Sequence, residues 1–293
     1  MVVDAVEEFE RHRARLFGLA YRLLGSAEEA EDVLQDTFLR WHRAQDWTVE
    51  SASAWLTKVA TNLCLNRLTS ARSRRESYVG TWLPEPVPTA DGALGPLDTA
   101  QRRDLVSLAF LVLLDRLNPV ERAVFVLREA FDYSHREVAE VVGLSEANAR
   151  QLYHRARRRL PANAGSPPGD RTRRRDLVER FLAAAEDGDL AGLERLLAED
   201  ATVWVDGGGR VGVARRPIAG LARVLRYLGG VLNMTAGQVR LRLSEVNGDP
   251  AILALAGTDL IGVLAPDVEG EHVTGLRIIA NPDKLTFLAR LSH

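Results

Sequence analysis

Residues 133–160 read Tyr-Ser-His-Arg-Glu-Val-Ala-Glu-Val-Val-Gly-Leu-Ser-Glu-Ala-Asn-Ala-Arg-Gln-Leu-Tyr-His-Arg-Ala-Arg-Arg-Arg-Leu, and they constrain the architecture more than any other stretch. Gly143 permits a tight turn after a short helix that runs to Val142, and Ser145 stands where a helix N-cap belongs. A second helix follows, and its apolar residues recur on one inward face: Ala149, Leu152, Ala156 and Leu160. This order predicts a helix-turn-helix.

The opposite face of the second helix carries hydrogen-bond donors and positive charge, at Arg150, Gln151, His154, Arg155 and Arg158. Arg and Gln have the donor geometry to read base edges in a major groove, and every Arg can neutralise a phosphate. The alternative is a solvated basic helix end beside another domain. Because turn, cap, apolar stripe and basic stripe all agree, the pattern favours DNA binding.

The chain has 293 residues, a formal net charge of −2 and a single cysteine, Cys64. This length predicts two or three domains. Cys64 lies within an apolar helical pattern, which indicates a buried structural thiol. The acidic first residues and the lack of a long apolar run argue against a secretory signal and a membrane span, so we expect a cytoplasmic protein without a membrane partner.

Charge is unevenly distributed along the chain. Basic residues cluster at 67–75, 150–159 and 171–175, whereas acidic residues gather at 28–36. Local clusters set the field that a partner feels, and net charge does not. Two surfaces of opposite sign therefore suggest two macromolecular partners.

The first 75 residues are predicted to be helical, with breaks at Gly25-Ser26 and in the loop after Ala44. On the helix predicted from Ala54 to about Arg72, one stripe joins an aromatic ring, a Lys, amides and a hydroxyl: Trp55, Lys58, Asn62, Asn66 and Thr69. Such a stripe suits a single-stranded, unstacked DNA segment better than a duplex. The alternative is a polar helix face with Trp55 packed against the core.

Two linkers separate the predicted domains. Residues 76–99 are rich in Pro and Gly but also hold Trp82 and Leu83, and a passive tether has no need of that pair, so we expect it to dock onto a neighbouring domain. A second linker at 163–175 precedes a domain of different character. The predicted domains are therefore 1–75, 100–162 and 176–293.

The third domain is predicted to be α+β. A helical pattern over 176–197 is broken at Gly188-Asp189, and another helix is expected near 218–232. Strand-like runs then alternate with turns, and Asn247-Gly248 is a strong hairpin signal. We expect a curved antiparallel sheet covered by helices.

The order of these motifs closely resembles one family, the extracytoplasmic-function (ECF) sigma factors of bacterial RNA polymerase. Tyr21-Arg-Leu-Leu-Gly and Ala30-Glu-Asp-Val-Leu-Gln-Asp-Thr-Phe-Leu-Arg-Trp resemble conserved region 2, and Leu117-Asn-Pro-Val-Glu-Arg with the helix-turn-helix resembles region 4. Trp82-Leu-Pro-Glu-Pro, Asp206-Gly-Gly-Gly-Arg and Asn281-Pro-Asp-Lys-Leu resemble a subgroup with a fused C-terminal SnoaL-like domain. The resemblance implies a multidomain fold: two all-α sigma domains, then an α+β SnoaL-like cone.

The resemblance also implies roles. The 145–160 helix would read the −35 element, and Trp55, Lys58, Asn62 and Asn66, with the Gln45–Ser53 loop, would recognise and open the −10 element. The family often has an acidic residue where this chain has Asn66, so the −10 base preference stays open. The partners would be promoter DNA and core polymerase, through the clamp helices of its largest subunit and the flap of its second-largest subunit. The clamp contact would fall on Asp32, Gln35, Asp36, Leu39 and Arg40.

Three readings of the third domain remain open. A SnoaL-like cone encloses a pocket that could perform acid-base catalysis with Trp204, Asp206, Asn281 and Asp283, or could sense a small ligand. The resemblance favours a built-in regulator that replaces a separate anti-sigma protein. Its expected contact residues are Trp82, Leu83, Asp206, Arg210, Asn281, Asp283 and Lys284.

The sequence thus predicts a promoter-specificity factor that performs no chemistry itself and needs no cofactor, metal or catalytic residue. One rival is a conventional helix-turn-helix regulator with a ligand-sensing domain, which would leave residues 26–41 unexplained. The other is a SnoaL-type enzyme with a DNA-binding extension.

Overall fold

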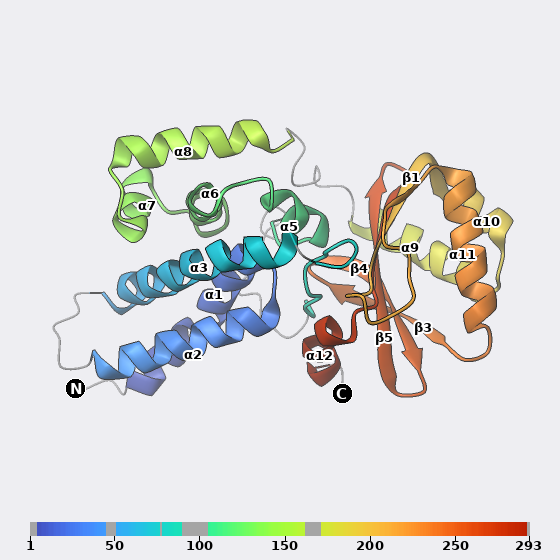
Figure 1. The fold of residues 1–293 in the computed structure, drawn as a ribbon, viewed down its shortest axis with the longest axis horizontal. Coiled ribbons are helices and arrows are strands. Elements are labelled where there is room, and N and C mark those ends of the chain that lie inside the picture. The colour runs from blue at the N-terminus through green and yellow to red at the C-terminus, as the bar shows by residue number, and fades with distance from the viewer. Residues whose placement is uncertain (1–4, 45–50, 77, 90–104, 162–170, 292–293) are drawn as a thin grey trace. The chain divides into compact units, whose positions relative to one another are not determined.

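The computed structural model describes residues 5–44, 51–76, 78–89, 105–161 and 171–291, and their order along the chain can be followed in Figure 1. They fall into two compact units. The helical unit comprises residues 1–76, 90–106 and 110–165, and the C-terminal unit comprises residues 77–89, 107–109 and 166–293. Segment 77–89 therefore belongs to the unit whose main body follows some eighty residues later in the chain.

The helical unit contains two sets of helices. The first set is α1 (Ala5–Leu24), α2 (Ala27–Arg43) and α3 (Ala52–Glu76). The second set is α5 (Leu108–Leu114), α6 (Pro119–Phe131), α7 (His135–Val142) and α8 (Glu146–Arg159). This arrangement confirms the prediction that these residues are all-α, including the helix-turn-helix of α7 and α8.

Local signals set the helix ends. Gly25 follows α1 with a positive φ of 69°, and the Ser26 side chain accepts the Glu29 N–H at the start of α2. Ser51 accepts the Ala54 N–H at the start of α3. The α6 and α7 helices both begin with a complete capping box, which satisfies N–H groups that a helix start otherwise leaves unpaired.

The C-terminal unit packs helices against one sheet. Its helices are α9 (Arg171–Glu186), α10 (Leu190–Leu196), α11 (Leu221–Thr235) and α12 (Pro282–Leu291). Its strands are β1 (Leu197–Asp206), β2 (Ile218–Ala219), β3 (Arg240–Val246), β4 (Asp249–Ala256), β5 (Asp259–Glu269) and β6 (His272–Ile279). The strand order is β2-β1-β6-β5-β4-β3, which confirms the predicted α+β class.

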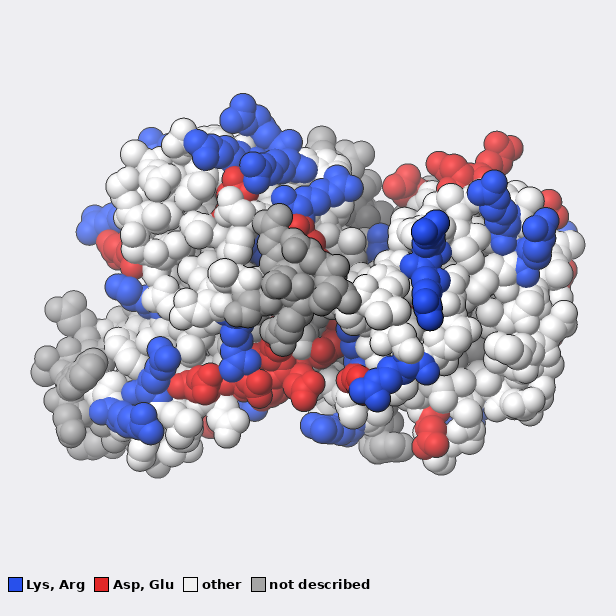
Figure 2. Space-filling view, viewed as in Figure 1, with Lys and Arg blue, Asp and Glu red and all other residues white. Residues whose placement is uncertain are grey.

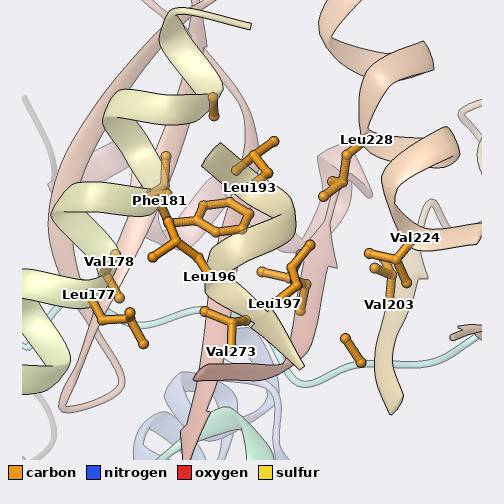
Figure 3. Close-up of a cluster of buried hydrophobic side chains, with 14 of the residues drawn as sticks. Leu177, Val178, Phe181, Leu193, Leu196, Leu197, Val203, Val224, Leu228 and Val273 are labelled. Atoms are coloured by element: carbon orange, nitrogen blue, oxygen red, sulfur yellow. The ribbon is translucent and has the colours of Figure 1, made fainter. Parts of the chain in front are cut away.

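The core of this unit lies between the sheet and α9, α10 and α11 (Figure 3). Phe181 of α9, Leu193 of α10 and Val224 of α11 meet Val203 of β1 and Leu276 of β6, and each of these side chains is buried. Because successive residues of a strand face opposite sides, Trp204 and Asp206 point away from this core.

Three details depart from the expectations. The α9 helix begins at Arg171 and not near 176, because Arg171 and Arg174 form ion pairs with Glu245 and Asp249 of the β3–β4 hairpin. Residues 218–219 form the short strand β2, and α11 starts only at Leu221. The sheet is not wholly antiparallel, since β1 and β6 pair in parallel, which the long connection between them allows.

Candidate nucleic-acid interfaces and a linker-binding site

The α8 helix presents its basic face to solvent. The side chains of Arg150, Gln151, His154, Arg155 and Arg158 are all exposed, whereas Ala149 and Ala156 are buried. Lys and Arg side chains gather along α8 in Figure 2. Arg150 pairs with Glu146 one turn earlier, but Arg155 and Arg158 form no ion pair with any described residue. The face that the sequence predicts for duplex DNA is thus accessible.

Residues that the sequence analysis did not single out hold α8 on α6. The Tyr153 hydroxyl donates to Glu129 of α6, and Arg159 pairs with Glu121 at 2.5 Å. Glu121 is 1% exposed and also accepts the Asn118 N–H in the α6 capping box. The helical period placed Tyr153 beside the inward face, but nothing in the sequence indicated its carboxylate partner.

The predicted single-strand stripe on α3 is only partly free. Lys58, Asn62 and Asn66 are exposed at successive turns of the helix. The Trp55 ring is half-buried and packs against Trp41 of α2, with ring centroids 5.5 Å apart. Residues 45–50 of the predicted Gln45–Ser53 loop lie outside the described residues.

Ion pairs join the acidic face of α2 to α3. Arg67 donates to Asp32 and to Asp36, each at 3.0 Å, and these interactions raise the pKa of the guanidinium although its partial burial opposes them. Gln35, Leu39 and Arg40 are exposed, and 46% of Leu39 is accessible to solvent. Acidic side chains gather on this face in Figure 2. The five predicted contact residues therefore share one surface, and two of them also join the helices.

In the C-terminal unit, Asp206 lies at the centre of a buried polar site. Its carboxylate is 0% exposed and accepts hydrogen bonds from the Tyr78 hydroxyl at 2.5 Å, the Leu83 N–H at 2.8 Å and the Gly208 N–H at 3.1 Å. Lys284 of α12 adds an ion pair at 2.7 Å. A buried carboxylate is tolerated only with such partners. Two of the four donors come from segment 78–89.

Lys284 is itself enclosed by the same segment. Its ammonium lies 4.4 Å from the Trp82 ring centroid and 4.9 Å from the Tyr78 ring centroid, and it donates to the Leu83 carbonyl. Both aromatic faces attract a cation, and the side chain is 9% exposed. Lys284 therefore binds a hydrogen-bond acceptor of segment 78–89, and Asp206 binds hydrogen-bond donors of the same segment.

Asn281 and the glycine turn complete the site. The Asn281 amide donates to the Tyr78 hydroxyl at 2.9 Å, and its carbonyl accepts the Asp283 N–H at the start of α12. Gly208 has a φ of 59°, and a Cβ there would lie 2.4 Å from the Asn281 amide nitrogen, so glycine is required. Arg210 and Asp283 form an exposed ion pair at 3.0 Å, a kind that contributes little.

A second contact holds the end of the segment. The Asn247 side-chain oxygen Oδ1 accepts the Val87 N–H, and the main-chain N–H of Asn247 donates to the Val87 carbonyl. The Gly248 N–H donates to the Thr89 hydroxyl. Asn247 is 1% exposed and Val87 is 0% exposed. The sequence indicated Asn247-Gly248 only as a hairpin turn. The structure brings together all seven predicted regulatory residues, and it adds Tyr78, Val87 and Asn247.

The four residues expected for catalysis, Trp204, Asp206, Asn281 and Asp283, do not line either of the two surface clefts described below. Trp204 stacks under Arg277, 4.9 Å from its guanidinium, and Asp283 is 61% exposed. Two surface clefts, of about 380 and 890 Å³, are lined by other residues of the C-terminal unit. Within the described ranges no group of His, Cys, Asp and Glu could hold a metal ion, and no helix is long and apolar enough to cross a bilayer.

Comparison with known proteins connects these surfaces to a family. Residues 9–74 match the model of Sigma-70 region 2, and residues 107–160 match that of Sigma-70 region 4. The ECF RNA polymerase sigma factor SigJ of Mycobacterium tuberculosis is 39% identical, over 96% of this chain and 93% of the relative. The probable ECF sigma factor SigI of the same organism is 32% identical, over 94% and 92%.

The solved structures agree. The crystal structure of the Mycobacterium tuberculosis extracytoplasmic function sigma factor SigJ superposes with a TM-score of 0.76 at 35% identity, and the match covers 96% of this chain and 98% of that one. The similarity therefore includes the C-terminal unit as well as both helical regions. This chain belongs to the ECF RNA polymerase sigma factors.

Proposed function

We propose that this sigma factor reads the −35 element with α8. We also propose that it is regulated by the binding of segment 78–89 to the rest of its C-terminal unit. As a member of the family it directs core RNA polymerase to promoters. The exposed face of Arg150, Gln151, His154, Arg155 and Arg158 would enter the major groove. Arg155 and Arg158 support this role, since each retains its full donor capacity for DNA.

Region 2 would supply the other contacts. Lys58, Asn62 and Asn66 of α3 would bind the opened −10 strand, with Trp55 at the edge of this surface. The exposed apolar side chain of Leu39, flanked by Gln35 and Arg40, suits helix-on-helix docking against the polymerase clamp.

The regulatory proposal rests on one observation: Asp206 and Lys284 form a buried ion pair whose remaining partners include the peptide and side chains of segment 78–89. This segment lies between region 2 and region 4 in the chain. Holding it fixes the path of the connection between the two DNA-binding regions. The C-terminal unit would thus perform in cis what a separate anti-sigma protein does in trans.

In vitro transcription with purified core polymerase and a promoter library tests the proposal. The full chain would be compared with an Asp206→Asn/Lys284→Met double variant, which removes both charges, and with Arg223→Gln on the exposed face of α11 as a control. We expect promoter-specific transcripts from all three and a several-fold change in yield for the double variant alone. The sign of the change shows whether the binding of segment 78–89 by Asp206 and Lys284 inhibits or supports initiation.

Two results would contradict the proposal in different ways. Equal yields from all three proteins would remove the regulatory role. Duplex binding without any transcript, from the full chain and from a version ending near Ala162, would replace the sigma role with that of a conventional regulator.

A further inference from the structure

The smaller of the two surface clefts lies on the outer face of the C-terminal sheet, on the side away from the core. Leu241 and Leu243 of β3 pack against that core, so the alternate residues Arg240 and Arg242 face the other side. On this outer side α12 packs against β5, and the cleft opens beside it over β3, β4 and β5. Its volume of about 380 Å³ falls within the range of pockets that bind small molecules, about 300–1,000 Å³.

The deeper part of the cleft is apolar. Residues of β4, β5 and one face of α12 form it: Leu253, Leu255, Leu260, Pro282, Leu285 and Ala289. Leu253 and Leu285 are only 1% and 3% exposed, so they lie at the bottom. An apolar floor of this kind favours a hydrocarbon group over water.

The rim of the cleft on β3 is basic. Arg240 is paired across the sheet with Leu255, and Arg242 with Leu253, so each arginine flanks a leucine of the floor. The two positions share one face of the strand and are about 6–7 Å apart. Both side chains are exposed, and neither forms an ion pair with a residue that the structure describes. Two neighbouring positive charges without a counter-charge attract an anion.

One carboxylate, Asp259, is present among the described lining residues. It pairs across the sheet with Ala256 and lies on β5, whereas the arginines lie on β3, with β4 between them. Two strand spacings separate it from the basic rim, about 10 Å. An anion held by Arg240 and Arg242 is therefore well separated from this negative charge.

The lining fits a ligand with one apolar part and one anionic part. A carboxylate matches the planar donor fork of each guanidinium, and a hydrocarbon tail would cover the leucines. A small polar anion would leave the apolar floor uncovered, and an uncharged hydrocarbon would leave both arginines without a counter-charge.

The cleft shares α12 with the linker-binding site. Leu285 lines the cleft, and its neighbour Lys284 pairs with Asp206 and donates to segment 78–89. Pro282, at the start of the same helix, also lines the cleft. A ligand packed on this face of α12 would gain its contacts only while the helix lies where Lys284 reaches Asp206. Such a ligand favours that position of the helix, by its difference in affinity for the two states.

We propose that this cleft binds a small amphipathic carboxylate, and that its occupancy strengthens the binding of segment 78–89 by α12. The binding site stands on the geometry of the C-terminal unit alone. The effect on transcription rests on the proposed regulatory function.

Calorimetric titration of the full chain tests the site, with decanoate as the probe. Decanol supplies the tail without the charge, and acetate supplies the charge without the tail. We expect decanoate to bind and each of the other two to bind at least about tenfold more weakly, because each forgoes one half of the contacts.

Two variants separate the rim from the cavity. Arg240→Gln/Arg242→Gln removes the basic rim and should weaken decanoate binding about tenfold or more. Thr286→Trp places a large side chain in the cleft from an exposed position of α12, and it should block binding. The matched control is Arg223→Gln/Arg226→Gln, which removes two exposed arginines of α11 outside the cleft and should bind decanoate as the native chain does.

Hydrogen exchange of segment 78–89, followed by mass spectrometry, tests the coupling. The N–H groups of Leu83 and Val87 are hydrogen-bonded only while the segment is bound. Decanoate should slow their exchange several-fold in the native chain and in the α11 control. It should leave their exchange unchanged in Arg240→Gln/Arg242→Gln.

The possible failures are distinct. Equal decanoate affinity in the native chain, Arg240→Gln/Arg242→Gln and Thr286→Trp would overturn the site, and decanol binding as tightly as decanoate would overturn the carboxylate. Decanoate binding with unchanged exchange of segment 78–89 would overturn the coupling. The proposed regulation fails separately, through equal transcript yields from Asp206→Asn/Lys284→Met and the native chain, and that result leaves the binding data intact.

Discussion

At the scale of single residues, Asp206 shows how a position suggestive of catalysis can serve a structural role. Its carboxylate is fully buried, and Tyr78, Leu83, Gly208 and Lys284 donate to it. These four donors come from two segments of the chain, 78–89 and the C-terminal part, and they surround the carboxylate on several sides. The charge and its hydrogen bonds instead select one peptide segment.

The costs of removing Asp206 and Lys284 should not add. Lys284→Met leaves a buried carboxylate without its cation, which typically costs about 3–5 kcal/mol. Adding Asp206→Asn removes that uncompensated charge, so the double variant should be less destabilised than the sum of the single variants. Chemical denaturation of the four proteins gives the coupling free energy, and strictly additive costs would show that the pair is not coupled.

The Tyr78 hydroxyl should lose its proton at a higher pH than an ordinary tyrosine does. Burial, followed by the hydrogen bond to Asp206, raises the pKa of its hydroxyl. A group whose folded pKa is raised contributes stability that is complete below its unfolded pKa of about 10 and is lost as pH rises through the folded value. Tyrosinate absorbance should therefore show the same change near pH 10 in the native protein and in Tyr78→Phe. A smaller change in the variant would contradict the buried hydrogen bond.

Arg155→Ala should weaken −35 binding. If Arg155 contacts a base, the loss should be about 1–3 kcal/mol with relaxed specificity at that position, and if it contacts a phosphate the salt slope should fall by about one. Binding to DNA with variant −35 sequences, measured at several salt concentrations, separates the two cases. Arg223→Ala, an exposed helical position outside the sigma regions, is the control. Unchanged binding by Arg155→Ala would refute the assigned face.

At the scale of elements, α8 is oriented by α6 as much as by its own turn. Tyr153 reaches Glu129 and Arg159 reaches Glu121, so the middle and the C-terminal end of α8 are held on α6. Tyr153→Phe keeps the ring packed on Phe125 and removes only the hydroxyl, a change worth about 1 kcal/mol. We expect weaker binding to all −35 sequences with an unchanged salt slope, measured beside Arg155→Ala. A reduced slope would mean that Tyr153 contacts phosphate itself.

The elements also show what the sequence could predict. Local chemistry predicted the end of α7 and the start of α8, because Gly143 and Ser145 act within one turn of themselves. The parallel pairing of β1 with β6 could not be predicted, since it joins residues about seventy positions apart. The early start of α9 depends likewise on Glu245 and Asp249 of a distant hairpin.

The candidate site also combines residues that the sequence could predict with residues that it could not. Its seven predicted residues came from short motifs that the family resemblance marked. Tyr78, Val87 and Asn247 had no such signal, because their roles follow from where segment 78–89 lies in the folded C-terminal unit.

At the scale of the whole molecule, a chain that ends near Ala162 should not only lack the C-terminal unit but also expose apolar residues of segment 78–89. Leu83 and Val87 are 1% and 0% exposed in the full chain, and the truncation removes the partners Asp206, Asn247 and Lys284. We expect the truncated protein to bind a hydrophobic dye more strongly than the full chain. Replacing Leu83 and Val87 with Ser in the truncated protein should reverse most of that gain, and no reversal would place the exposed apolar surface elsewhere.

Segment 78–89 is, in thermodynamic terms, a ligand that is covalently attached to its receptor. Tethering gives an effective concentration of up to about a millimolar, so a peptide of modest intrinsic affinity can occupy its site in the intact chain. Occupancy then depends on whatever changes the distance between the tether's ends, and not on the amount of protein in the cell. A free peptide of this sequence would compete only at comparable millimolar concentrations, whereas an event that pulls on the connection could empty the site at once.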